Sequence, residues 1–244
     1  MKSNPLHEDP VQPTGNASSV SHLRGLLEVT RLLRADEDLE SLLNACARTV
    51  SESLGYGTAV ITLYRPAFDD FEVVSVHGSD GAREVLMGAV RLWDDWAPLL
   101  DERFDRQGAY LIEHDSFDWE TVEQTSFIPQ FEPSDHPDAW HPEDALIVPL
   151  HGSASEHPLG FLSVDEPASG KKPTDSELEV LVAVAAHAAL AVETAQESAL
   201  AARHREALEQ LLRVSAELTD SKSIESILGA VCDGIESALG FQKV

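Results

Sequence analysis

The stretch Asp144–Ala195 restricts the fold of this chain more than any other part. Two short apolar runs, 145–150 and 159–164, flank a polar segment that contains Gly152 and Pro158. Short apolar runs joined by turn-forming residues are typical of a β-hairpin. The residues of the first run that share one face are Leu146, Val148 and Leu150.

A helix is predicted directly after this hairpin. Thr174 is followed three residues later by Glu177, which is the pattern of a capping box at a helix start. From Leu178 to Val192 apolar residues recur at helical spacing. The hairpin and helix contain no nucleophile and no metal-binding cluster, so we interpret them as a packing unit.

The preceding part of the chain alternates between helical and extended patterns. In chain order these patterns predict a helix over 21–53, strands over 58–64 and 71–77, a short helix over 82–87, a helix over 93–104 and a short strand over 110–112. Residues 113–143 show no periodicity and contain four prolines and two tryptophans. Irregular segments of this length in compact domains are often functional.

The C-terminal residues repeat the start of the chain at an offset of 185 positions (224 − 39). Leu39–Leu43 matches Ile224–Leu228, and Leu54–Tyr56 matches Leu239–Phe241, without a gap. We therefore expect the first helix of a second module at the C-terminus, and that this chain is a fragment of a longer protein. A half-module cannot bury its apolar face alone.

Four segments follow from these patterns. They are a disordered lead-in over 1–20, a sensor-like domain over 21–195, a helical linker over 196–211, and the first helix of a truncated second domain over 212–244. The linker has no Gly or Pro and is polar around its middle, as in helices that bridge domains or pair with a partner helix.

Charge and cysteine content restrict the partners and the compartment. The formal net charge of −26 disfavours nucleic acid and anionic membrane surfaces, because both require clustered Lys and Arg. The sequence contains no uninterrupted run of 18 apolar residues, so it predicts no transmembrane helix. The two cysteines, Cys46 and Cys232, both fall in helical patterns and are expected to be small core residues. We expect a reduced, cytoplasmic protein.

The order of elements resembles that of the GAF domain, a small-molecule sensor module found in tandem in bacterial signalling proteins. The resemblance covers roughly Ser21–Thr194. It depends on the opening helix that ends in Leu54–Tyr56, on the Val148–Leu150 strand, on Leu159–Val164, and on the closing helix from Pro173.

The resemblance implies an α+β sandwich of the PAS or profilin type. Its central antiparallel sheet would have about six strands, with the terminal helices on one face and a ligand pocket on the other. It further implies a homodimer formed through the terminal helices and a downstream output domain, commonly a histidine kinase, a cyclic-dinucleotide enzyme, a phosphatase or a transcription regulator. A continuous helix leaving the domain could carry a signal from the pocket.

The candidate ligand-binding residues are aromatic for the most part. Trp93, Trp96 and Phe104 could line the pocket, or could instead pack their helix on the sheet; Trp119 and Trp140 lie in irregular sequence where no core pattern explains them. The complete set of candidates is Trp93, Trp96, Phe104, Tyr110, His114, Trp119, Trp140 and Val148.

Metal, haem and thiol chemistry receive little support from the sequence. Five histidines lie between His114 and His157, but no pair has the i, i+4 spacing of a metal-binding helix. One histidine could ligate haem, as in some members of the family. Neither cysteine has a resolving partner, and we expect no catalytic residue and no enzyme activity in this segment.

The acidity of the region expected to form the pocket restricts the kind of ligand. Between Asp101 and Asp144 thirteen acids accompany only Arg103 and Arg106. A neutral or cationic small molecule is therefore easier to accommodate than the cyclic nucleotides bound by other family members, whose NKFD-like motif is absent. The leading hypothesis is a sensor that binds an unknown small molecule; the alternatives are a ligand-free dimerisation scaffold and a haem or redox sensor.

Overall fold

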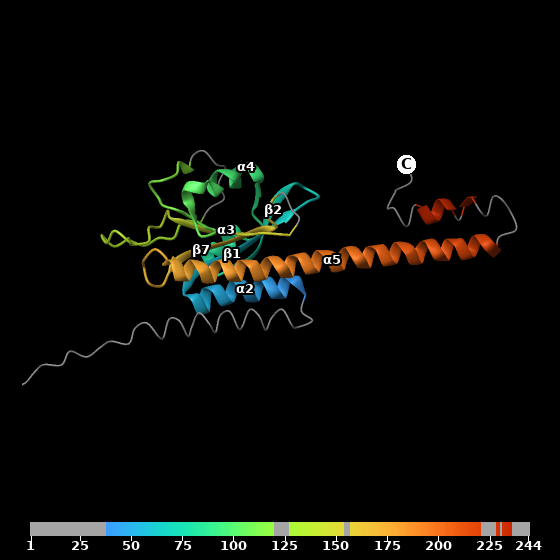
Figure 1. Cartoon of the computed structure of the whole chain (residues 1–244), viewed down its shortest axis with the longest axis horizontal. Coiled ribbons are helices and arrows are strands. Elements are labelled where there is room, and N and C mark those ends of the chain that lie inside the picture. Colours follow the sequence, from blue (N-terminus) through green and yellow to red (C-terminus); the bar gives the residue numbers. More distant parts are fainter. Residues whose placement is uncertain (1–37, 120–126, 154–156, 221–227, 230, 236–244) are drawn as a thin grey trace, which may run out of the picture. The chain divides into compact units, whose positions relative to one another are not determined.

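The fold is built on one antiparallel sheet of seven strands in the order β3-β2-β1-β7-β6-β5-β4 (Figure 1). The computed structural model describes residues 38–119, 127–153, 157–220, 228–229 and 231–235. The strands are β1 (Tyr56–Arg65), β2 (Asp70–His77), β3 (Val90–Leu92), β4 (Asp105–Arg106), β5 (Ala109–Ile112), β6 (Ala145–Leu150) and β7 (Gly160–Pro167). The family resemblance implies about six strands, and the sequence patterns predict five. The two strands without a predicted counterpart are β3 and β4, which have too few residues to show a period.

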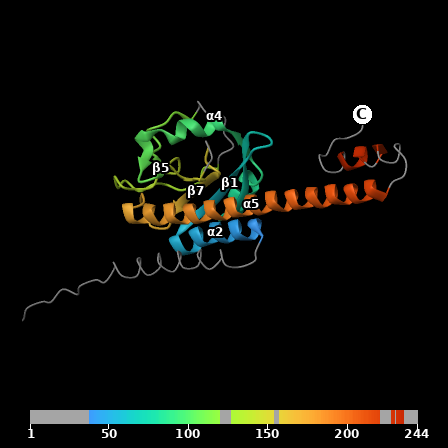
Figure 2. The same ribbon diagram turned by 45° about the vertical axis from the view of Figure 1, so that its right-hand side comes forward.

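Two helices cover one face of the sheet. Helix α2 (Leu39–Leu54) and the first part of α5 (Asp175–Asp220) lie side by side beneath the strands (Figures 1 and 2). Their apolar faces share one buried cluster with inward-facing strand residues, among them Leu43 and Val50 of α2 and Leu181 of α5. This is the arrangement that the resemblance implies for the terminal helices. The first part of the predicted 21–53 helix, residues 21–37, lies outside the described residues.

The opposite face carries short elements and the irregular loop. These elements are α3 (Asp80–Leu86), α4 (Trp93–Trp96), and the 3₁₀ turns η1 (Ala97–Leu100) and η2 (Glu102–Phe104). The sequence predicts one helix over 93–104; the segment is helical, but it is divided into α4, η1 and η2. Pro98 lies in the first turn of η1. Asp101 is extended and its carboxylate accepts the Arg103 N–H, so one helical element ends before Asp101 and a new one begins after it.

The predicted hairpin is confirmed by the pairing of β6 with β7. Leu146, Val148 and Leu150 belong to the cluster on the helix side, whereas Ile147 belongs to the cluster on the other side, so β6 is buried on both faces as its alternation predicts. Pro149 is tolerated because β5 pairs only with Ala145–Ile147. Gly160 is required, since a Cβ there would lie 2.0 Å from the Thr62 carbonyl oxygen.

The predicted capping box is present at the start of α5. The Thr174 N–H donates to Glu177 Oε2 at 2.8 Å, and the Glu177 N–H donates to Thr174 Oγ1 at 3.4 Å. The helix is, over Asp175–Ser215, long and apolar enough to cross a membrane by length and composition alone. This is weak evidence for a membrane span, because a core helix passes the same test and Leu178, Leu181 and Val184 are buried against the sheet.

Residues 193–244 form a second compact unit. In its described part, α5 continues to Asp220, and Gly234 of a further helical turn packs against Val214. Cys232 is exposed, contrary to the core position expected for it, because the described part of this unit contains no strand to cover its helix. Most of the repeated segment lies outside the described residues, so the second module stays a prediction.

Candidate functional site

A cavity of about 270 Å³ lies over the sheet on the side away from α2 and α5. Its floor comes from alternate residues of two neighbouring strands: Thr58, Val60 and Thr62 of β1, and Ser163 and Asp165 of β7. The register pairs Thr58 with Asp165 and Val60 with Ser163, so these side chains share one face of the sheet. The floor therefore carries small polar side chains around Val60 and an acid, Asp165, at one end.

Aromatic side chains form much of the cavity wall. Trp96 of α4 is only 5% exposed and stacks on Phe161, with ring centroids 4.1 Å apart and planes at 16°. The Trp96 Nε1–H is buried and finds no acceptor among the described residues. Trp119 and Phe127 also line the cavity. Stacked aromatic rings give a rigid surface for the apolar body of a small molecule.

Asp165 marks the acidic end of the cavity. Its Oδ1 accepts hydrogen bonds from the Trp140 Nε1–H at 2.8 Å and from the Glu166 N–H at 2.6 Å. Burial raises the pKa of the Asp165 carboxyl to about 7, and the nearby charges of Glu166 and Asp144 act in the same direction against its two hydrogen bonds. This carboxyl is poised to change its charge near neutral pH.

Asp144 lies beside it, and its fully buried side chain fastens the irregular loop to the strand β6. Its two carboxylate oxygens accept the backbone N–H groups of His114 at 2.9 Å and His141 at 2.8 Å. The two imidazole rings stack with their centroids 3.9 Å apart. Since both oxygens of Asp144 already have donors, its part in the site is to hold the wall in place.

Arg91 of β3 provides the positive charge of the cavity lining. Its guanidinium carbon lies 5.4 Å from the centre of a Trp96 ring, within the range of a cation–π contact. Burial lowers the pKa of Arg91, and the neighbouring Asp95 opposes that shift. The cavity therefore has one acidic end, at Asp144 and Asp165, and a separate basic residue at Arg91.

Comparison with known families identifies the family to which this architecture belongs. The sequence model of the GAF domain matches residues 38–192. The chain belongs to the GAF domain family. In related proteins GAF domains are sensor modules of signalling proteins. No curated protein matches the sequence.

Solved structures of low sequence identity share this GAF fold. The GAF domain of a phosphoenolpyruvate-protein phosphotransferase from Coxiella burnetii is 17% identical, with a TM-score of 0.51 over 75% of this chain and 98% of that one. Bacteriophytochrome RpBphP3 from R. palustris is 12% identical, with a TM-score of 0.61 over 94% and 47%. The free methionine-R-sulfoxide reductase from Neisseria meningitidis is 13% identical, with a TM-score of 0.51 over 80% and 98%. At such identities the likeness shows the fold alone.

The candidate residues named from the sequence fall into four groups in this GAF domain. Trp96 and Trp119 line the cavity. His114 and Trp140 stand behind it, where they hydrogen-bond Asp144 and Asp165. Val148 lies in the cluster on the helix side of the sheet and takes no part in the cavity.

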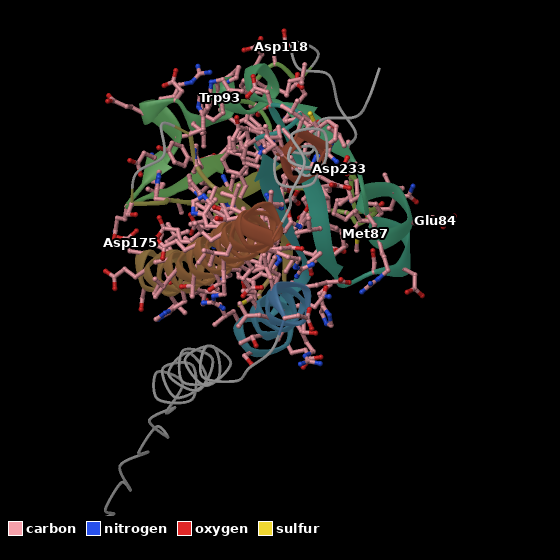
Figure 3. The ribbon with its side chains drawn as sticks, turned by 90° about the vertical axis from the view of Figure 1, so that its right-hand side faces the viewer. Glu84, Met87, Trp93, Asp118, Asp175 and Asp233 are labelled. Atoms are coloured by element: carbon pink, nitrogen blue, oxygen red, sulfur yellow. The ribbon has the colours of Figure 1, made fainter. Side chains whose placement is uncertain are left out.

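The other three candidates pack around the cavity without lining it. Trp93, Phe104 and Tyr110 belong to the apolar cluster on the cavity side of the sheet. The Trp93 ring contacts the ring of His157 at 4.4 Å. Figure 3 shows Trp93 and Asp118 on the side of the sheet opposite to Asp175, the first residue of α5.

Sequence reasoning missed the polar residues of the cavity, which are Thr58, Thr62, Arg91, Glu143, Asp144, Ser163 and Asp165. A signal for two of them existed. The strand β7 alternates Phe161, Ser163 and Asp165 with Leu162 and Val164, so an acid falls on a face that should be covered. An ionisable residue at such a position indicates a functional site or a buried partner.

The described residues offer no ready metal centre. Among them, no group of three or more His, Cys, Asp and Glu side chains is placed to hold a metal ion. Cys46 is buried among helix-facing residues on the other side of the sheet, and burial raises the pKa of its thiol to about 11. A thiol with so high a pKa is a poor nucleophile at neutral pH.

Proposed function

We propose that this GAF domain is a regulatory sensor module that binds a small molecule in the cavity and passes the binding event to α5. The observation that carries the proposal is the cavity itself. About 270 Å³ remains open although Trp96 and Trp119 form its wall. Small-molecule sites are concave and mostly apolar, with a few convergent polar groups, and this cavity has that composition.

The proposed relay to α5 is supported by contacts through the sheet. On β7, Ser163 and Asp165 face the cavity while Leu162 and Val164 pack in the cluster that contains the buried residues of α5. Trp140 belongs to that same cluster, yet its indole donates to Asp165 in the cavity wall. A ligand that moves the Asp165 carboxylate would therefore disturb the packing under α5.

We infer a homodimer as the form that transmits the signal. Leucines on the exposed surface of α5 support this, namely Leu200, Leu208, Leu211 and Leu212, with Leu212 70% exposed. Exposed leucines along one helix favour pairing with a second helix. Light scattering of the purified chain should give twice the monomer mass, and Leu208→Glu combined with Leu211→Glu should give the monomer.

The compartment, the output domain and the partners are proposed from the net charge and from the family. We propose a cytoplasmic protein whose output domain lies in a longer chain, without a nucleic-acid or membrane partner. The charge of −26 supports this. Non-enzymatic action is supported by the position of both cysteines outside the cavity lining. The open cavity favours a ligand-binding sensor over a ligand-free scaffold.

A thermal-unfolding screen of the full chain against metabolites tests the proposal. A ligand at a hundred times its dissociation constant should stabilise the protein by about 2.7 kcal/mol. Ser163→Leu fills the cavity from β7 and should abolish that gain, whereas Ser176→Leu adds the same side chain at an exposed position of α5 and should preserve it. Stabilisation that survives Ser163→Leu would place the ligand elsewhere.

A further inference from the structure

The second oxygen of Asp165 is a hydrogen-bond acceptor in the cavity lining that still needs a donor. Oδ1 accepts two hydrogen bonds, whereas no described residue donates to Oδ2. Oδ2 is also not among the buried polar atoms that are sealed from solvent without a partner. Because Asp165 lines the cavity, a bound molecule that reaches its carboxylate has Oδ2 as the acceptor without a donor.

The surroundings of Asp165 are negative. Glu143 and Asp144 also line the cavity, and Glu166 follows on β7, where its carboxylate accepts the hydroxyl hydrogen of Thr58 at 2.9 Å. No Lys or Arg among the described residues lines this end of the cavity. A half-buried carboxylate without a counter-ion is costly, and a cation placed against it offsets that cost.

The positive residue of the lining is too distant to share a small charged group with Asp165. Asp165 pairs with Thr58 on β1, while Arg91 pairs with Phe71, which pairs with Tyr64 six residues further along β1. The two positions are thus separated by about 20 Å along the strands and by three strand spacings, about 14 Å, across them. The ammonium and carboxylate of an α-amino acid are attached to one carbon and cannot contact both residues.

The space between the two ends is mostly apolar, with Thr62 and Ser163 as polar side chains on its floor. Val60, Val73 and Phe127 line it together with Trp96 and Trp119. A hydrocarbon or aromatic body of modest size would be covered there, which is the main source of affinity in such pockets.

We infer that the ligand of this cavity is a small organic amine: its ammonium group donates to Oδ2 of Asp165, its apolar body lies against Trp96 and Trp119, and it carries no carboxylate beside the ammonium. This inference depends on the proposed function, because it names the chemical class that the sensor cavity accepts. It excludes free α-amino acids and organic anions from this site.

Four probes that differ in one group test the inference by calorimetry on the full chain at pH 8. They are phenethylamine, 2-phenylethanol, phenylalanine and phenylacetate. We expect phenethylamine to bind at least about tenfold more tightly than each of the others, since it alone offers a cation without an unpaired anion. Equal or tighter binding of the alcohol, the amino acid or the acid would overturn the inference while the proposed sensor function stands.

Two matched variants identify the residue responsible. Asp165→Asn keeps an acceptor for Trp140 but removes the charge, and should weaken phenethylamine binding roughly a hundredfold. Glu179→Gln removes one negative charge from an exposed position of α5 and should leave the affinity unchanged. Unchanged affinity in Asp165→Asn would overturn the inference. If neither the four probes nor the metabolite screen stabilises the protein, the proposed function itself fails.

Discussion

The indole Nε1–H of Trp140 donates a 2.8 Å hydrogen bond to Oδ1 of Asp165, and the two residues belong to opposite sides of the sheet. Trp140 is 1% exposed in the cluster shared with α2 and α5, whereas Asp165 lines the cavity. This bond connects the end of the irregular loop to β7. It therefore joins the site that we propose for the ligand to the core beneath the long helix.

Replacing Trp140 with Phe should destabilise the protein by about 2–3 kcal/mol. The change removes one of the two donors to a carboxylate in the cavity wall and leaves a gap in a packed cluster. Urea unfolding followed by circular dichroism measures the loss. Trp93→Phe is the control, since Trp93 is half-buried, and should cost less. Equal costs for the two variants would contradict the importance given to the Trp140–Asp165 bond.

The stability of the ligand-free protein should depend on Asp165 between pH 5 and 8. Because its pKa is raised to about 7 in the folded protein, the folded state binds a proton that the unfolded state has lost, and stability falls as the pH rises toward 7. Above about pH 7 this contribution is constant. The lowered pKa values of Asp38 and Asp70 act in the opposite direction, but only below about pH 4.

Asp165→Asn isolates this effect. The free energy of unfolding of this variant minus that of the native protein should increase by about 1–2 kcal/mol from pH 5 to pH 8. This is less than the full pKa shift implies, because Oδ2 keeps some contact with solvent. Chemical unfolding at four pH values measures the difference. A constant difference across this range would show that the Asp165 pKa is not raised.

Binding of phenethylamine should strengthen as the pH rises from 6 to 8. A primary amine, like a lysine side chain, stays protonated in this range, whereas Asp165 becomes charged near pH 7. Affinity should rise by up to about tenfold per pH unit below that value and level off above it. Glu143 and Asp144 also line the cavity, Glu166 is next to Asp165 on β7, and His114 and His141 contact Asp144, so Asp165→Asn is needed as the control. A slope that persists in Asp165→Asn would assign the titration to one of these groups.

The two cysteines should differ sharply toward an aromatic disulfide reagent at pH 8. Cys232 is exposed and should react at once, whereas Cys46 is buried with a pKa raised to about 11 and should react only on unfolding. Cys232→Ser and Cys46→Ser separate the two reactions. Immediate labelling of folded Cys232→Ser would show that Cys46 is accessible and would reopen the question of thiol chemistry.

Local sequence signals predicted the parts of this fold that depend on neighbouring residues. The Thr174–Glu177 capping box and the alternation around Val148 both follow from a few positions, and the structure confirms them. The single helix predicted over 93–104 is divided into α4, η1 and η2, a division that was not predicted because the apolar spacing does not register the breaks at Pro98 and Asp101. An apolar pattern indicates which residues are buried, but it does not show where one helical element ends and the next begins.

The cavity was only partly foreseeable. Trp96 and Trp119 were candidates because large aromatic residues stand out in sequence, but Asp165 and Arg91 were not named. Their positions depend on strand order, which places β7 next to β1 although the two are far apart in the chain. Whether an acid on a strand faces solvent or a cavity is decided by that long-range pairing.

A crystal structure of the protein with the amine that gives the largest thermal stabilisation tests the central claim most directly. We predict that the amine lies in the cavity between Trp96 and Trp119, with its nitrogen within hydrogen-bond distance of Asp165 Oδ2. A ligand bound outside this cavity, or one whose nitrogen points away from Asp165 toward Arg91, would contradict the account.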